Sequence, residues 1–281
     1  MSGAGGRPGT RSVGTALALI ATLVAACSGS DGAELADARA PVASEAAVEE
    51  GCEWPVWGQN PRRTFAQPCG SDLSTSTVDR LALDWSVTTE DVITASVAVV
   101  DGTVYAGDWS GTVVALDDDT GEERWRFETD VHDNVYSGRI VAAPAVADVE
   151  GSRSVFVAGG KTMHRVDATT GELLWRFDVA TFDRDDDLDT DRDVPDAERP
   201  TEIQSSPVVV EGMVIFGFDG HDKPGWRAGV VALDAVTGEL VWYFDPDDGG
   251  EPTGCAGVWS SPSVDVERAQ VRAGSPVGGK Y

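Results

Sequence analysis

Three stretches of the chain repeat one pattern and decide its fold: ALDDDTGEERWRF at Ala115–Phe127, RVDATTGELLWRF at Arg165–Phe177 and ALDAVTGELVWYF at Ala232–Phe244. They share Asp-x-x-Thr-Gly-Glu-x-x-Trp-x-Phe, and their Thr-Gly pairs are separated by 50 and then by 67 residues. Self-similarity at such a period is typical of proteins built from one repeated supersecondary unit.

The chemistry of the pattern predicts a strand, a tight turn and a second strand. An aspartate carboxylate accepts backbone amide hydrogen bonds within a turn, and glycine adopts positive φ at no steric cost. The tryptophan follows at a fixed phase, where its large ring can fill the space between neighbouring sheets. We therefore interpret the repeated residues as structural: Asp117, Gly121, Trp125, Asp167, Gly171, Trp175, Asp234, Gly238 and Trp242.

A second repeat precedes each of these units: SVAVVDGTVYAG from Ser96, APAVADVEGSRSVFVAG from Ala143 and SPVVVEGMVIFG from Ser206. Valine-rich runs that flank Asp-Gly or Glu-Gly predict β-hairpins. Hairpin and Trp strand together give four strands per unit, which indicates an all-β fold, a β-propeller of four-stranded blades. LALDWSV at Leu81–Val87 is predicted to be an earlier outer strand that carries Trp85.

The N-terminal region is predicted to be an export signal. Arg7 and Arg11 precede an apolar run, Val13–Ala26, that is too short to span a membrane. The run ends at Cys27, as in a bacterial lipobox, so we expect residues 1–26 to be removed and Cys27 to be lipidated. Residues 27–50 are small and acidic and predict a disordered tether. The expected location is the cell envelope, with the chain anchored to the extracytoplasmic face of a membrane.

Charge and cysteine content exclude some functions. With 21 Lys and Arg against 48 Asp and Glu, the net charge is −27, and a nucleic-acid partner needs a basic face. Cys52 and Cys69 bracket one short segment and are the favoured disulfide pair, which leaves Cys255 over. No C-x-x-C-H attachment site for haem occurs. The three histidines lie far apart in the sequence and are expected at the surface.

The motif Ala-x-Asp-x-x-Thr-Gly-x-x-x-Trp resembles the tryptophan-docking motif of quinoprotein alcohol dehydrogenases and related pyrroloquinoline-quinone (PQQ)-like propellers. It matches at Ala115–Trp125 and Ala232–Trp242, and Arg165 replaces the alanine in the middle copy. WPVWGQNPRRT at Trp54–Thr64 is similar to the start of that family, and the polar stretch with LALDWSV that follows is similar to polyvinyl-alcohol-dehydrogenase-like proteins. The resemblance covers about residues 53–265. It is strong for the fold and weak for activity, because propellers that assist outer-membrane assembly use the same blades without a cofactor.

The resemblance implies seven or eight blades, whereas this sequence offers three and the start of another, WSSPSVD at Trp259–Asp265. The alternation then fails. Three explanations stay open: a gene truncated or frameshifted near residue 266, self-assembly into a ring, or a second chain that supplies the remainder. The predicted organisation is a leading segment at 51–80 and a partial propeller at 81–281, with blades at about 81–128, 140–179, 202–245 and 257–281 and an acidic insertion at 183–200.

The resemblance also implies PQQ and Ca²⁺ over a central channel, with an aspartate as the base. We expect the matching segments beyond residue 265, so the catalytic residues stay unknown. The adjacent cysteine pair that covers PQQ in some members is absent. Trp259 and Cys255 are weak candidates for a cofactor site, with packing or a disulfide as the alternative role.

The acidic insertion contains alternating carboxylates that imitate an EF-hand calcium loop. Arg192 stands where glycine is needed, and Pro195 stiffens the second half, so a solvated charge run is the alternative. The candidate calcium ligands are Asp187, Asp189, Asp191, Asp193 and Glu198.

Two functions remain open from the sequence. The first is a non-catalytic, lipid-anchored binding or scaffold module of the envelope. The second is the N-terminal part of a PQQ-dependent alcohol-dehydrogenase-like oxidoreductase.

Overall fold

The structure is a computed structural model, and it describes residues 53–67, 69, 73–129, 139–180, 201–220, 228–246 and 257–275. Among these residues the fold is all-β, as predicted, apart from one short 3₁₀-helix, η1 (Val78–Arg80). Within the same residues, no helix has the length and apolar character needed to cross a membrane. Cys27, Cys52, Cys255 and the candidate calcium ligands lie outside the described residues, so those expectations stay predictions.

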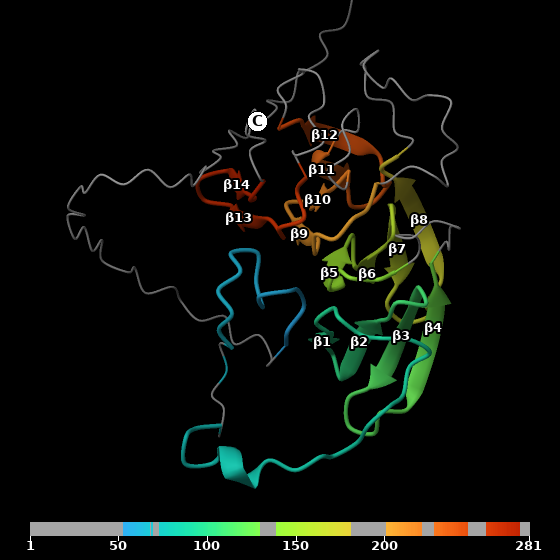
Figure 1. Cartoon of the computed structure of the whole chain (residues 1–281), viewed down its shortest axis with the longest axis vertical. Helices are drawn as coiled ribbons and strands as arrows, with labels where there is room; N and C mark the ends of the chain where they lie inside the picture. The colour runs from blue at the N-terminus through green and yellow to red at the C-terminus, as the bar shows by residue number, and fades with distance from the viewer. Residues whose placement is uncertain are drawn as a thin grey trace, which may run out of the picture.

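Three four-stranded antiparallel sheets follow one another along the chain and form an arc (Figure 1). Each sheet is one blade, with its strands in sequence order from the inner to the outer edge. Blade 1 holds β1 (Ala98–Val100), β2 (Thr103–Gly107), β3 (Thr112–Asp117) and β4 (Glu123–Glu128). Blade 2 holds β5 (Ala145–Val149), β6 (Ser152–Gly159), β7 (Thr162–Asp167) and β8 (Leu173–Asp178). Blade 3 holds β9 (Val208–Val210), β10 (Met213–Phe218), β11 (Gly229–Asp234) and β12 (Leu240–Phe244).

The start of a fourth blade is a hairpin of β13 (Ser263–Asp265) and β14 (Gln270–Arg272). The sequence pattern did not predict β14, because the strand is short and carries a single apolar residue, Val271. That residue is buried against blade 3, which supplies the packing that local alternation does not show. Ser260 Oγ accepts a hydrogen bond from Gly274 N, as Ser205 Oγ accepts one from Gly217 N in blade 3.

The hairpin turns between the first and second strands confirm the Asp-Gly and Glu-Gly signals. Both residues of each turn have positive φ, for example 47° at Asp101 and 66° at Gly102. Two such residues in succession match the right-handed twist of the strands they join.

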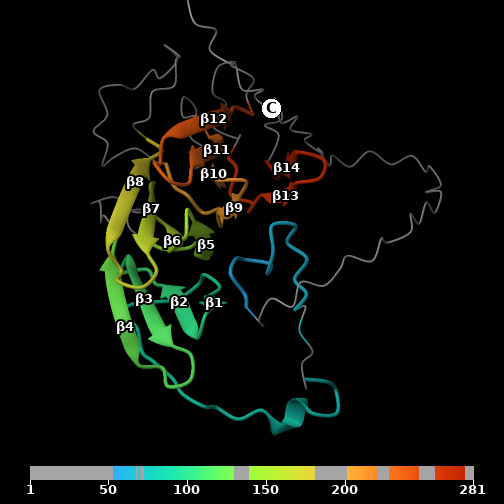
Figure 2. The ribbon, with the colours of Figure 1, turned by 180° about the vertical axis from the view of Figure 1, so that it is seen from behind.

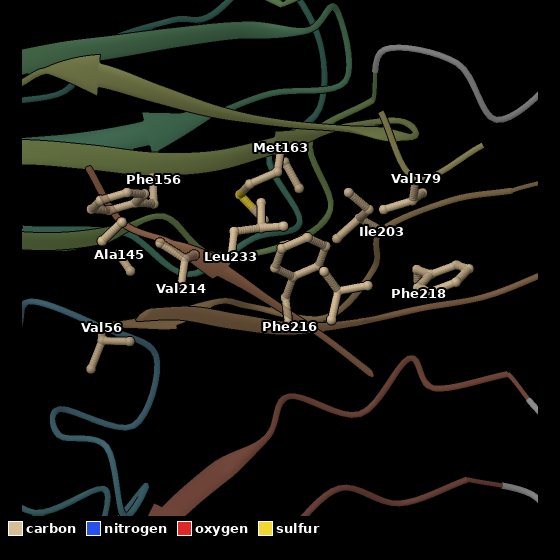
Figure 3. Close-up of a cluster of buried hydrophobic side chains, with 14 of the residues drawn as sticks. Val56, Ala145, Phe156, Met163, Val179, Ile203, Val214, Phe216, Phe218 and Leu233 are labelled. Carbon is tan, nitrogen blue, oxygen red and sulfur yellow. The ribbon is translucent and has the colours of Figure 1, made fainter. Parts of the chain in front are cut away.

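A core fills the space between blades 2 and 3, as Figure 3 shows. Met163 and Phe156 of blade 2 meet Phe216 and Leu233 of blade 3, and all four side chains are fully buried. One histidine is also inside: His164 on β7 is 1% exposed and lies edge-on to Phe127 at 5.4 Å between ring centroids. The expectation of a surface position was wrong for His164 because the central strands of a blade are covered on both faces.

Each blade is joined to the next by a tryptophan that docks on the following Asp-x-x-Thr-Gly turn. Trp125 Nε1 donates to the carbonyl of Ala168 at 2.9 Å, and Trp175 Nε1 donates to that of Ala235 at 3.1 Å. The indole lies flat on the turn glycine. A Cβ on Gly171 would come within 2.9 Å of the Trp125 ring, so the glycine supplies a close approach as well as its φ of +76°.

The aspartate of each turn holds the loop in shape for this contact. Asp167 Oδ1 accepts hydrogen bonds from the amides of Thr169 and Thr170, both at 2.9 Å. In blade 1, hydrogen bonds from Arg124 and Thr120 lower the pKa of Asp117 to about 2. Arg165, which replaces the motif alanine in blade 2, is 6% exposed and donates to the carbonyl of Val236 in the next turn at 3.0 Å. The departure from the motif therefore adds a second bond across the same seam.

The first part of the leading segment, residues 53–65, lies along the inner edges of the blades (Figures 1 and 2). Trp54 pairs with Val99 of β1, the carbonyl of Pro55 accepts from Val146 N of β5, and the carbonyl of Pro61 accepts from Val264 N of β13. These bonds use backbone groups that the innermost strands would otherwise leave unpaired.

Arg63 is the centre of this contact. Its guanidinium donates to the carbonyls of Ser206 at 2.9 Å, Pro207 at 3.2 Å and Pro262 at 3.0 Å, and also to that of Trp57. Burial lowers the pKa of Arg63 to about 10, which leaves the group charged at neutral pH. A single side chain thus ties the leading segment to the inner edges of blades 3 and 4.

The close approach of Trp125 to Gly171 predicts a difference between two glycine variants. Gly151 has a similar φ of +80°, but a Cβ there would meet nothing within 4 Å. We expect Gly151→Ala to lower the free energy of unfolding by about 1 kcal/mol through backbone strain alone. Gly171→Ala also displaces the indole and should lower it by about 3 kcal/mol. Urea unfolding followed by circular dichroism measures both, and equal losses would contradict the docking role.

The contacts of Arg63 predict a second matched pair. Arg63→Met keeps the length of the side chain but leaves buried carbonyls without donors, and should lower the free energy of unfolding by about 3 kcal/mol or more. The control is Arg62→Met. Arg62 is 45% exposed and makes solvent-screened ion pairs with Asp265 at 3.9 Å and Glu267 at 3.5 Å, so its loss should change stability by about 1 kcal/mol at most. Thermal unfolding of the two variants that gives indistinguishable shifts would refute the central role of Arg63.

Candidate functional site

The candidate site is the face of the arc at which the connections between blades gather. The strands of a blade are antiparallel, so successive connections alternate between its two faces. The connection from the fourth strand of one blade to the first strand of the next therefore lies at the same face as the connection between the second and third strands of a blade. Three hydrogen bonds between these links confirm it: Ile140 N to the carbonyl of Asp108, Ile203 N to that of Gly160, and Val258 N to that of Phe218. We call this the loop face.

Three segments occupy equivalent positions on the loop face: RIVAAP from Arg139, EIQSSP from Glu202 and GVWSSP from Gly257. The second residue of each is a buried anchor, and Ile140, Ile203 and Val258 are at most 2% exposed. The first and third residues differ in character between blades. The three links therefore differ most at these two positions, while the apolar anchor and the Pro position are shared.

The serines of these segments belong to the framework. Ser206 Oγ accepts a hydrogen bond from Ala143 N at 3.0 Å, and Ser261 Oγ accepts one from Ser206 N at 2.9 Å. The segment before the first strand of each blade is thereby hydrogen-bonded to the equivalent segment of the neighbouring blade. These hydroxyls are occupied in the seam and are poor candidates for nucleophiles.

Two acidic residues of the loop face, Glu202 and Asp219, lie at the link to blade 3. Glu202 is 3% exposed, and its Oε2 accepts a hydrogen bond from Gln204 Nε2 at 2.8 Å. Its backbone pairs with that of Asp219 at the end of blade 3's second strand. At Gly257 a Cβ would come within 2.2 Å of the Asp219 carboxylate, so a larger residue at the third equivalent position would require that carboxylate to move.

Cationic and aromatic groups also lie on this face. The Arg139 guanidinium stacks over the Trp109 ring at 4.7 Å from its centroid, a favourable cation–π geometry. Lys161 is 3% exposed and is paired with Asp178 at 3.1 Å. Trp259, a cofactor-site candidate from the sequence, has 59% of its surface exposed. An indole so open on the surface is not needed for core packing and is available to a ligand.

The opposite face carries the tight turns and a different set of charges. A cavity of 280 Å³ lies there between blades 1 and 2, lined by Glu53, Pro55, Val100, Val146, Ala147, Asp148 and Arg153. Arg153 is already bound to Asp101 and Asp148, both at 2.7 Å. In the described part of the chain, the one group of three carboxylates that could hold a metal ion, Asp117–Asp119, is also on this face. Asp117 is engaged there in closing its own turn.

The described loop face fits PQQ only in part. An exposed indole and a stacked arginine suit a planar molecule that carries carboxylates. Calcium requires several convergent oxygen ligands, and the described residues bring no three carboxylates together at this face. The described residues thus do not complete a site for PQQ with Ca²⁺.

The sequence singled out Trp259 as a weak cofactor-site candidate, with packing as the alternative role, and it missed Glu202, Gln204 and Arg139. The Ser-Pro signal that marks each inner strand could have found them, because aligning the three segments on their prolines exposes the variable positions. The nine motif residues lie at the turns and seams between blades, as interpreted from the sequence.

The relatives of the chain include quinohemoprotein alcohol dehydrogenases. Residues 54–274 match the PQQ family, described as "Glucose/ethanol/alcohol dehydrogenase, beta-propeller domain". Quinohemoprotein alcohol dehydrogenase ADH IIB of Pseudomonas putida is 29% identical over 72% of this chain and 27% of its own length. Polyvinylalcohol dehydrogenase of a Pseudomonas species is 24% identical over 78% of this chain and 35% of its own.

Solved structures show the same fold. Quinohemoprotein alcohol dehydrogenase ADHIIG of Pseudomonas putida superposes with a TM-score of 0.61 at 24% identity, over 77% of this chain and 33% of that one. The enzyme of Comamonas testosteroni gives 0.61 at 22% identity, over 77% and 34%. The chain therefore spans about a quarter to a third of the length of the relatives it matches. The family match over most of the sequence, carried by blades that dock through Trp and Thr-Gly, shows that the chain belongs to the PQQ family of β-propeller proteins.

Proposed function

We propose that the chain, as it stands, is a non-catalytic module: a rigid arc of PQQ-type blades that presents its loop face for binding. The main support is that the polar side chains of the repeats already have structural hydrogen-bond partners. Arg63 donates to backbone carbonyls, the motif aspartates accept from turn amides, and the serines hydrogen-bond across the seams between blades. What is left open on the loop face is a recognition surface centred on the exposed indole of Trp259.

A second function is favoured by the family match. The relatives are named as alcohol dehydrogenases, and this chain matches only part of each. On this alternative the chain is the N-terminal part of a PQQ-dependent oxidoreductase, and its blades form one side of a channel that further blades complete. PQQ and Ca²⁺ would then be bound only by the completed ring.

Dye reduction separates the two functions. The purified full chain is supplied with PQQ, Ca²⁺, ethanol and an electron-accepting dye. We expect no dye reduction above the protein-free control, because the described residues bring no three carboxylates together at the loop face. Protein-dependent reduction that requires both PQQ and ethanol would overturn the non-catalytic proposal and establish the second function.

The N-terminal pattern extends the proposal to location. We propose that the chain is exported and held at the outer face of a membrane by a lipid on Cys27, with residues 28–50 as the tether. Mass spectrometry of the mature N-terminus is expected to show a diacylglyceryl group on Cys27 and the loss of residues 1–26. An unmodified Cys27, or cleavage at another residue, would contradict the anchor.

A further inference from the structure

The hairpin between the first and second strands is longer in blade 2 than in its neighbours. β5 has five residues, whereas β1 and β9 have three each. Two cross-strand pairs are added next to the turn, Asp148 opposite Arg153 and Val149 opposite Ser152. At the rise of an extended strand, the hairpin of blade 2 is about 7 Å longer than that of blade 1. This departure from the repeat places charged side chains at the seam between blades 1 and 2.

Arg153 of the longer hairpin reaches across that seam. Its Nη1 donates to Asp101 Oδ2 in the turn of blade 1 at 2.7 Å. Its Nε and Nη2 donate to the two carboxylate oxygens of Asp148 at 2.7 and 3.0 Å. The hydrogen bonds to Asp148 are the main reason that the pKa of Arg153 lies above its ordinary value. Two carboxylates therefore already neutralise this guanidinium, and an anionic ligand would have to displace one of them.

The cavity of 280 Å³ lies between this ion-paired group and the leading segment. Its apolar lining residues are Pro55, Val100, Val146 and Ala147. Backbone hydrogen bonds hold these walls together: Val146 N donates to the carbonyl of Pro55 at 2.7 Å, and Trp54 and Val99 exchange two bonds of 2.8 and 3.0 Å. The walls are thus fixed by the inner strands, and a ligand would enter a largely preformed site.

Glu53 supplies a negative charge to this cavity that no described cation neutralises. Its Oε1 accepts a hydrogen bond from Asp101 N at 3.3 Å, and within the described part of the chain it has no ion pair with a lysine or arginine. Around the cavity, the carboxylates of Glu53, Asp101 and Asp148 stand against the single guanidinium of Arg153, which leaves a net charge of −2. The charge balance therefore favours a cation.

The lining residues also restrict the kind of cation. A divalent metal ion needs several convergent oxygen ligands, and among the described residues only Asp117–Asp119 bring three carboxylates together. A quaternary ammonium is recognised by aromatic rings, and none of the lining residues is aromatic. A primary ammonium needs only hydrogen-bond acceptors, which the free carboxylate of Glu53 provides.

We propose that this cavity binds a primary ammonium group carried on a short aliphatic chain. The ammonium donates to the carboxylate of Glu53, and the chain lies against Pro55, Val146 and Ala147. The volume is below the range of about 300–1,000 Å³ that is typical of sites for drug-sized ligands, so the chain has only a few carbons. Because the site lies on the face opposite the loop face, it goes beyond the proposed function and does not depend on it.

Amide NMR spectra of the nitrogen-15-labelled full chain test the site with three five-carbon probes at millimolar concentrations. We expect pentylamine to shift the amides of Val100 and Ala147 in a saturable way. Pentanamide has the same chain without the charge and should bind at least tenfold more weakly. Pentanoate carries the opposite charge and should cause no shift at these two amides.

Three variants separate the site from general attraction to an acidic protein. Glu53→Gln should weaken pentylamine binding at least tenfold. Glu239→Gln removes the same charge from an exposed side chain at the tight turn of blade 3, and should change the affinity less than twofold. Ala147→Leu fills the cavity without a change of charge and should abolish binding. Glu53 is partly exposed, so if Ala147→Leu does not fold, the two glutamine variants decide the outcome.

Several results would overturn the proposal. They are the absence of shifts with pentylamine, equal binding of pentylamine and pentanoate, and equal losses in Glu53→Gln and Glu239→Gln. A fourth probe, Nα-acetyl-lysine N-methylamide, identifies the source of the ammonium. Binding at least as tight as that of pentylamine assigns the site to a lysine side chain of another polypeptide, and binding at least tenfold weaker assigns it to a free amine.

Discussion

The seating of an indole ring on the glycine of the next blade's turn is the contact on which the arc depends. Trp85, Trp125 and Trp175 each place the ring against a glycine at positive φ and donate to the carbonyl of the residue after the turn aspartate. The geometry fixes both the distance and the rotation between neighbouring sheets. Because a blade contacts only its neighbours, the stability of the array is a sum of blade and seam contributions, and each seam depends on one indole, one glycine and one aspartate.

The innermost strands have an unpaired edge, and the leading segment provides hydrogen-bond partners for it. The innermost strands are three to five residues long and would present free backbone groups toward the axis. Trp54, Pro55 and Pro61 pair with them, and Arg63 gathers the carbonyls that precede β9 and β13. A guanidinium suits this place, because its planar donors can serve several carbonyls at once, which an ammonium on a flexible stem does less well. Tryptophan docking thus joins the blades at their outer strands, and the contacts of Trp54, Pro55, Pro61 and Arg63 join them at their inner strands.

Much of the fold could be predicted from sequence, because its decisive contacts are local in the repeat. The spacing of Asp, Thr-Gly and Trp within thirteen residues predicts the turn, the register and the docking ring together. What could not be predicted depends on non-local neighbours. His164 is buried because other strands cover β7, Arg63 finds its partners about 140 and 200 residues away, and Arg165 bonds to a turn in the next blade. Leu81–Val87 shows the converse: its pattern is that of a strand, but a pattern cannot supply the partner that makes one.

Family membership says more about the fold than about activity here, because the residues that determine the two lie in different parts of the blades. The residues that identify the family lie at the tight turns and blade seams, whereas the variable link positions, with Arg139, Glu202 and Trp259, lie at the loop face. Changes at the loop face leave the docking contacts untouched, so one array of blades can support a dehydrogenase or a binding surface. A loop face built from partial sets of ligands acquires chemistry only when enough blades surround the axis to converge on one point.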